Sequence, residues 1–115
     1  MKILALVLTL MALFAHPTRA ADAYTLKLYK NYCQSCHSTQ STGAPQSFDV
    51  REWQKRIDKK GRQTLLNNAI SGLGNMPPQG SCAECSYEDF EDLLSLMSSS
   101  QTPPQAQTPG KRKAQ

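Results

Sequence analysis

The stretch that decides the fold is Cys33-Gln34-Ser35-Cys36-His37, two cysteines separated by two residues and followed directly by a histidine. It closes a segment, residues 24–37, in which apolar residues recur at helical spacing. On a helix, Cys33 and Cys36 lie one turn apart on one side, and His37 projects toward that same side. The sequence therefore predicts a helix whose end presents two thiols and an imidazole together.

The pattern C-x-x-C-H is typical of covalent haem attachment, in which the two thiols add to the haem vinyl groups. Cys33 and Cys36 are thus expected to hold one haem c, with His37 as an axial ligand of its iron. A disulfide between Cys33 and Cys36, with an incidental His37, is the alternative that these residues leave open.

Met76 is the candidate for the second axial ligand. It lies in a loop, because Gly72 and Gly74 force a turn and Pro77-Pro78 cannot continue a helix. A thioether opposite histidine raises the reduction potential and fills the coordination sphere, which favours electron transfer over oxygen chemistry. Met76 in such a loop therefore predicts an electron-transfer centre.

The rest of the chain indicates an all-α fold of four short helices with long loops. After the segment 24–37, a second helix is expected from Asp49, with Glu52 in its capping position, to Gly61. A third is expected over Thr64–Ser71. The fourth begins after Ser86, which forms an acidic variant of the capping box with Asp89, and it runs to Met97.

Residues 1–20 have the features of a secretory signal peptide: a basic start, a short apolar run and small residues at the break. Cleavage after Ala20 is preferred, and Ala23 is the alternative. Export places the cysteines in an oxidising compartment, where they form disulfides or cofactor bonds. The mature chain keeps eleven basic and nine acidic residues, too small an excess for nucleic-acid binding.

The length and composition limit the class of protein. A chain of 115 residues, 39% of them hydrophobic, makes one domain, and it has no apolar stretch of the roughly 20 residues that a bilayer span needs. Residues 98–115 have no apolar periodicity and predict a flexible tail. Its basic end, Lys111-Arg112-Lys113, is either a solvated appendage or a weak contact for an acidic partner or an anionic membrane surface.

The order of motifs is similar to that of class I c-type cytochromes: His37, Gly43-Ala44-Pro45, Trp53, the Gly72–Gly74 turn and Met76-Pro77-Pro78. The pair Cys82-Ala83-Glu84-Cys85, directly after the Met-Pro-Pro loop, resembles the cytochrome c-five family of bacterial monohaem electron carriers. The resemblance covers about residues 24–97.

This resemblance implies a small cytochrome c-like fold, residues 21–97, around one covalently bound haem. It implies a disulfide between Cys82 and Cys85, and a hydrogen bond from the outer nitrogen of His37 to the Pro45 carbonyl that orients the ring. Trp53 is expected to pack near a haem propionate. The implied function is that of a periplasmic one-electron carrier between redox protein donors and acceptors, with no catalysis of its own.

The sequence leaves three alternatives to a free electron carrier. A four-cysteine zinc site is disfavoured, because 45 residues separate Cys36 from Cys82, against roughly 15–20 in the common pattern. A haem enzyme or sensor with a displaceable Met76 lacks an obvious distal acid or base. A dedicated haem subunit of a larger oxidoreductase, anchored through the basic tail, is the third.

A basic cluster lies along the second predicted helix and extends one residue beyond it. It is either a solvated face or a surface for docking or propionate pairing. Its members are Arg51, Lys55, Arg56, Lys59, Lys60 and Arg62.

Overall fold

A computed structural model describes residues 21–100. In this range the chain is helical, and its β-structure is limited to one isolated bridge between Leu73 and Met76. The predicted all-α class is therefore confirmed. Within the same range, no helix is long and apolar enough to cross a membrane. The predicted signal peptide and the basic end of the tail at Lys111, Arg112 and Lys113 lie outside the described residues.

The first predicted helix is present, but a π-helical turn interrupts it. Helix α2 (Ala23–Leu28) starts at Asp22, whose carboxylate accepts the Thr25 N–H at 2.7 Å. The turn η2 (Tyr29–Cys33) follows, and α3 (Gln34–His37) completes the segment. The Gln34 N–H bonds to the Tyr29 carbonyl, five residues back. This wider turn, which the apolar spacing did not predict, ends where the C-x-x-C-H motif begins.

Helices α4 (Val50–Lys60) and α5 (Arg62–Ser71) are separated by Gly61 alone. Asp49 caps α4 as predicted, since its carboxylate accepts the Glu52 N–H at 3.1 Å. The predicted start of α5 at Thr64 is wrong by two residues. No side chain caps this helix, so the start is set instead by Gly61 and by Arg62, which donates to the Glu91 carbonyl of the last helix at 3.0 Å.

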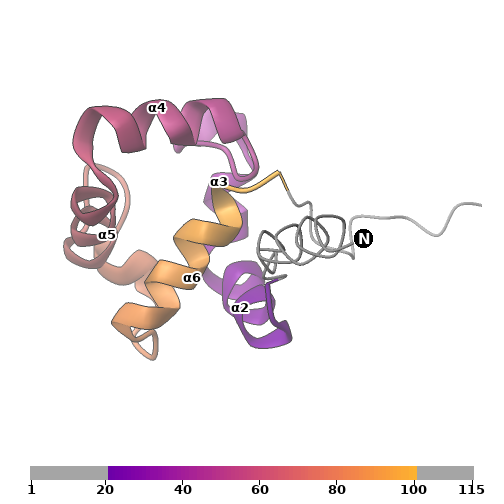
Figure 1. The fold of residues 1–115 in the computed structure, drawn as a ribbon. Coiled ribbons are helices and arrows are strands. Elements are labelled where there is room, and N and C mark those ends of the chain that lie inside the picture. The colour runs from indigo at the N-terminus through magenta and orange to yellow at the C-terminus, as the bar shows by residue number, and fades with distance from the viewer. Residues whose placement is uncertain (1–20, 101–115) are drawn as a thin grey trace, which may run out of the picture.

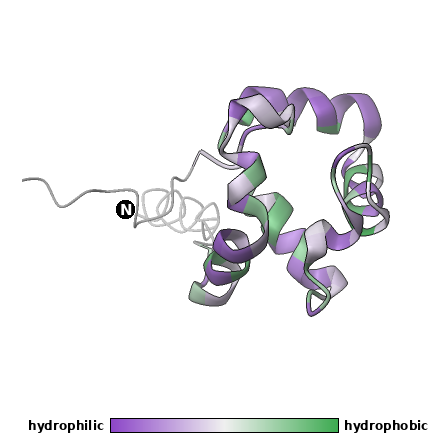
Figure 2. Ribbon diagram, turned by 180° about the vertical axis from the view of Figure 1, so that it is seen from behind, coloured by the Kyte–Doolittle hydropathy of each residue, from purple (hydrophilic) through white to green (hydrophobic). Residues whose placement is uncertain are grey.

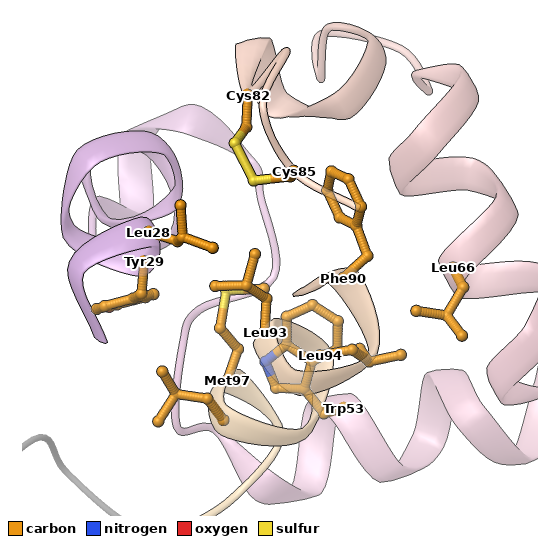
Figure 3. Packing of buried hydrophobic residues seen from close by; sticks show 11 residues of the cluster. Leu28, Tyr29, Trp53, Leu66, Cys82, Cys85, Phe90, Leu93, Leu94 and Met97 are labelled. Carbon is orange, nitrogen blue, oxygen red and sulfur yellow. A yellow bond between two sulfur atoms is a disulfide. The ribbon is translucent and has the colours of Figure 1, made fainter. Parts of the chain in front are cut away.

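The last helix, α6 (Tyr87–Met97), supplies much of the core (Figure 3). Its predicted capping box is confirmed: Ser86 N–H donates to the Asp89 carboxylate at 2.7 Å, and Asp89 N–H donates to Ser86 Oγ at 3.2 Å. Ser98 N–H bonds back to the Leu94 carbonyl and ends the helix. The buried cluster consists of Leu28, Tyr29, Trp53, Leu66, Cys82, Cys85, Phe90, Leu93, Leu94, Leu96 and Met97.

The helices are arranged around α6, which crosses the middle of the domain with α2 and α5 to either side and α4 along one edge (Figure 1). The short helices η3 (Gln40–Thr42) and η4 (Pro78–Ser81) lie in the two long loops. Helix α4 is mostly hydrophilic along its length (Figure 2). Its buried residue, Trp53, faces the rest of the domain.

Candidate haem site

The two cysteines of the C-x-x-C-H motif stand at the end of the first helical segment and are not joined in a disulfide. Cys33 is half-buried and Cys36 is exposed. Burial raises the pKa of the Cys33 thiol to about 11, so this thiol stays protonated at neutral pH. The disulfide alternative for this pair is not what the structure shows, and both sulfur atoms remain available to bind another group.

The imidazole of His37 is fixed by its outer nitrogen. His37 is 7% exposed, and its Nδ1 lies 2.8 Å from the Pro45 carbonyl oxygen. A carbonyl can only accept, so Nδ1 donates, and in the neutral imidazole Nε2 then has the lone pair. The His37 carbonyl in turn accepts the Ser47 N–H at 2.7 Å. This is the tautomer and the restraint that an iron-ligating histidine requires.

Trp53 lies beside this histidine. The indole and imidazole centroids are 6.1 Å apart, with the planes tilted by 30°, and the Trp53 side chain is buried. Its Nε1–H donates to the Gln46 carbonyl at 2.8 Å. Trp53 therefore uses its N–H within the protein, and its packing near a propionate stays a prediction.

Met76 sits on a tight turn that its neighbours hold closed. Its N–H and carbonyl each bond to Leu73 at 3.0 Å. Gly72 packs closely against the backbone of Met76 and Pro78. A Cβ on Gly72 would stand 2.9 Å from Pro78 N and 3.1 Å from the Met76 carbonyl oxygen. The Met76 methyl group would be 3.7 Å from a Cβ at Gly80. The half-buried thioether thus occupies a loop braced by close backbone contact.

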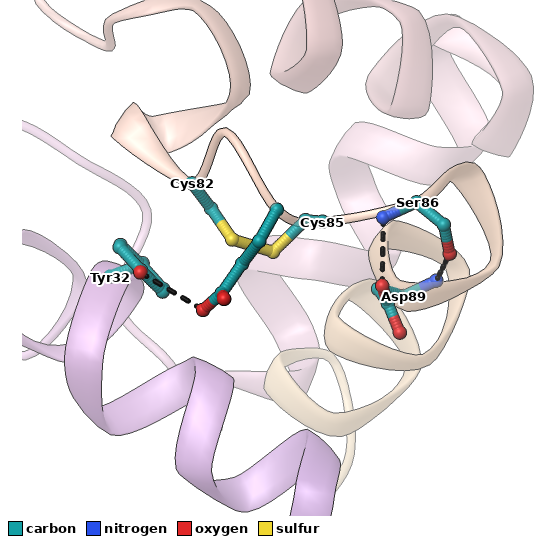
Figure 4. Close-up of a disulfide and its surroundings, with 6 residues drawn as sticks. Tyr32, Cys82, Cys85, Ser86 and Asp89 are labelled. Atoms are coloured by element: carbon teal, nitrogen blue, oxygen red, sulfur yellow. Dashed lines mark hydrogen bonds between the residues drawn. A yellow bond between two sulfur atoms is a disulfide. The ribbon is translucent and has the colours of Figure 1, made fainter.

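The second cysteine pair lies directly after this loop. The sulfur atoms of Cys82 and Cys85 are 1.97 Å apart, and both residues are buried. Glu84, between them, accepts a 3.0 Å hydrogen bond from the Tyr32 hydroxyl (Figure 4). That bond ties the disulfide loop to the residue preceding Cys33. With these two cysteines paired to each other, a four-cysteine zinc site is excluded.

In the basic cluster on α4 and at the start of α5, two of the six side chains have partners within the protein. Arg56 pairs with Glu52 at 2.8 Å, one turn away, and Arg62 binds the Glu91 carbonyl and Ser95 Oγ of α6. The other four cations are exposed: Arg51, Lys55, Lys59 and Lys60. Arg62 thus has a structural contact that the sequence did not indicate.

The sequence also missed residues that act through their backbone. The Gln46 carbonyl accepts a hydrogen bond from Trp53, and the Ser47 N–H donates one to the His37 carbonyl. Such main-chain bonds do not depend on the type of side chain, so the sequence does not reveal them. Ser47 Oγ is buried and lacks a hydrogen-bond partner. In this loop the family resemblance implied only the role of the Pro45 carbonyl as an acceptor, and the 2.8 Å bond with His37 Nδ1 is present.

The chain is similar to several known proteins. Residues 21–97 match the family model described as "Cytochrome C oxidase, cbb3-type, subunit III". Cytochrome c5 of Ectopseudomonas mendocina is 37% identical over 81 residues, covering 70% of this chain and 88% of that one. Cytochrome c5 of Azotobacter vinelandii is 41% identical over 68 residues, covering 58% and 82%.

A solved structure supports the fold. It is described as the crystal structure of an electron transfer complex of nitrite reductase with cytochrome c. The matched chain has a TM-score of 0.59 and 28% identity, and the match covers 69% of this chain and 95% of that one. The motifs, the fold and these relatives agree: the chain belongs to the cytochrome c5 family of class I c-type cytochromes, monohaem electron carriers that are not enzymes.

Proposed function

We propose that this chain is a periplasmic electron carrier whose haem is bound through the thiols of Cys33 and Cys36, with His37 and Met76 as the iron ligands. The observation that carries the proposal is the 2.8 Å bond from His37 Nδ1 to the Pro45 carbonyl. With Nδ1 bonded in this way, Nε2 is the ring nitrogen that can bind iron, and the imidazole can turn only a little.

The donor set fits a c-type haem. Cys33 and Cys36 are unpaired thiols three positions apart, and His37 Nδ1 is bonded to the Pro45 carbonyl, so Nε2 is the ring nitrogen left to bind iron. Met76 supplies a thioether from a loop that Gly72 keeps in close contact with Pro78. When bound, such a haem supplies one-electron exchange between ferric and ferrous iron.

The protein residues keep the ligands in place in both oxidation states. Pro45 and Ser47 hold His37 at its ring and at its carbonyl. The paired hydrogen bonds between Leu73 and Met76 close the loop that carries Met76. Fixed ligands mean that little has to move when an electron arrives or leaves, and this is the property that an electron carrier needs.

We place the carrier in the periplasm, with other redox proteins as its donors and acceptors. The signal-like residues 1–20 and the Cys82–Cys85 disulfide both suit an exported protein. The solved cytochrome c described above forms an electron transfer complex with nitrite reductase. Partners of this redox class are therefore expected here.

The methionine ligand can be tested with a matched pair of variants. Met76→Leu and Met97→Leu each replace a thioether by a hydrocarbon of similar volume, but only Met76 stands in the loop, whereas Met97 is buried in α6. Met76→Leu is expected to abolish the weak long-wavelength band typical of methionine-ligated ferric haem and to lower the reduction potential. Met97→Leu should keep both. Equal spectra and potentials in the two variants would contradict the assignment.

A second candidate, a dedicated subunit of a larger oxidoreductase, is favoured by one observation: the matching family is described as an oxidase subunit. Purification of the exported protein at native expression level separates the two. A free carrier elutes at the size of the single chain, and a subunit elutes with other chains in fixed ratio.

A further inference from the structure

Residues 44–48, here called the strap, pass beside His37, and hydrogen bonds fix them at four successive positions. The Pro45 carbonyl accepts from His37 Nδ1 at 2.8 Å, and the Gln46 carbonyl accepts from Trp53 Nε1 at 2.8 Å. The Ser47 N–H donates to the His37 carbonyl, and the Phe48 N–H donates to the Met97 carbonyl, both at 2.7 Å. The strap therefore connects α3, α4 and α6.

Within this set, the Trp53 bond is the one from a side chain that restrains the peptide unit after Gln46, next to Pro45; the Ser47 N–H of the same unit is held by the His37 carbonyl. The proline ring fixes φ of Pro45, so the direction of its carbonyl depends on the following peptide unit and on Gln46. The Gln46 carbonyl accepts its shorter bond, 2.8 Å, from the indole of Trp53, which is only 5% exposed, and a longer one, 3.3 Å, from the Asp49 N–H. Trp53 sits in the first turn of α4, whose start is fixed by the Asp49 cap. A rigid donor thus anchors the residue adjacent to the His37 acceptor.

We propose that Trp53 is a positioning residue for the redox centre: through Gln46 it holds the Pro45 carbonyl against His37 Nδ1–H. The inference rests on the proposed function, because it takes His37 as an iron ligand. A firm hydrogen bond at Nδ1 makes the imidazole a more basic ligand, which favours the oxidised iron. Loosening the strap therefore raises the reduction potential.

The chain offers a clean way to remove this one N–H. Trp53 is the single tryptophan of the sequence, so biosynthetic replacement of tryptophan by benzothienyl-alanine changes this position alone. The analogue keeps the bicyclic shape but has sulfur in place of the N–H. Trp53→Phe is the genetic counterpart. Leu28→Ala is the control, because Leu28 is buried in α2 and contributes no bond to the strap.

Two quantities are measured in the intact holoprotein: the reduction potential and the exchange rate of His37 Nδ1–H with deuterated water. Loss of one hydrogen bond is expected to speed this exchange roughly fivefold and to raise the potential, in both Trp53 variants. Leu28→Ala should lower the denaturation temperature while leaving the potential and the Nδ1–H exchange of the folded state unchanged.

The outcomes separate this inference from the proposed function. If both Trp53 variants lose stability but keep the wild-type potential and exchange rate, Trp53 is only a core residue and the inference is wrong. If the wild-type ferric protein shows no paramagnetic shift of the His37 ring signals, His37 is not the ligand, and the proposed function itself fails.

Discussion

Gly72 provides the sharpest test of how the Met76 loop is built, through substitution by alanine. Gly72 has φ +85° and ψ 148°, a backbone conformation that costs an L-residue about 1–3 kcal/mol. A Cβ at this position would also approach Pro78 N to 2.9 Å and Pro78 Cδ to 3.0 Å. Neither atom belongs to a flexible side chain, so overpacking adds about 1–3 kcal/mol.

Gly61 supplies the matched control, since its φ of +82° and ψ of 145° are nearly the same. A Cβ at Gly61 meets nothing within 4 Å. Gly61→Ala therefore measures the backbone cost alone, and the difference between the two variants measures the contact with the Met76 loop.

We expect Gly72→Ala to unfold about 10 °C below Gly61→Ala, given roughly 4–8 °C per kcal/mol for a domain of this size. The assay is thermal unfolding of the two holoproteins, followed by circular dichroism in the same buffer. Gly72→Ala should also weaken the long-wavelength band of the ferric protein, because it displaces the loop that carries Met76. Equal unfolding temperatures with an intact band would refute the reasoning.

Three further predictions concern other parts of the fold. Replacing both Cys82 and Cys85 by serine opens a loop with a sequence separation of 3 and should lower the free energy of unfolding in urea by about 2 kcal/mol, whereas an unchanged midpoint would show that the bridge is dispensable. Glu84→Gln should lower the pKa of Tyr32, which the hydrogen bond to the Glu84 carboxylate and then the charge of that carboxylate raise above 10.0. This bond stabilises the fold below the unfolded-state pKa of the phenol and is lost as the pH rises through the raised value, so phenolate absorbance should appear at lower pH in the variant. Ser47→Ala removes a buried hydroxyl without a partner and should stabilise the fold by about 1 kcal/mol, and a loss of stability on denaturant unfolding would show that the hydroxyl is satisfied in the holoprotein.

The sequence predicted the structural features that depend on residues close together in the chain. Asp49 and Ser86 cap helices through bonds that reach only three residues along the chain, so their pattern is visible in the sequence. The start of α5 was missed because Arg62 is held by α6, 29 residues away in the sequence. The π-helical turn at Tyr29–Cys33 was missed because apolar spacing alone does not distinguish a wide turn from a regular one.

In the candidate site too, some features could be predicted from the sequence and others could not. Cys33, Cys36, His37 and Met76 were identified because the chemistry of their side chains is specific. The strap was predicted only in part: the family resemblance implied the Pro45 carbonyl as the acceptor for His37, but the Gln46 carbonyl was missed, because every residue carries a carbonyl. Main-chain contacts of this kind become visible only once the chain is folded.

The separation of contacts along the chain has a consequence for folding order. The bond from His37 to Pro45 closes a loop of 8 residues, whereas that from Tyr32 to Glu84 closes one of 52. The longer closure costs about 1.7 kcal/mol more in chain entropy, and contacts between near neighbours form faster. The half of the domain that holds His37 can therefore assemble early from a short length of chain, and the contacts that hold the disulfide loop after Met76 form later.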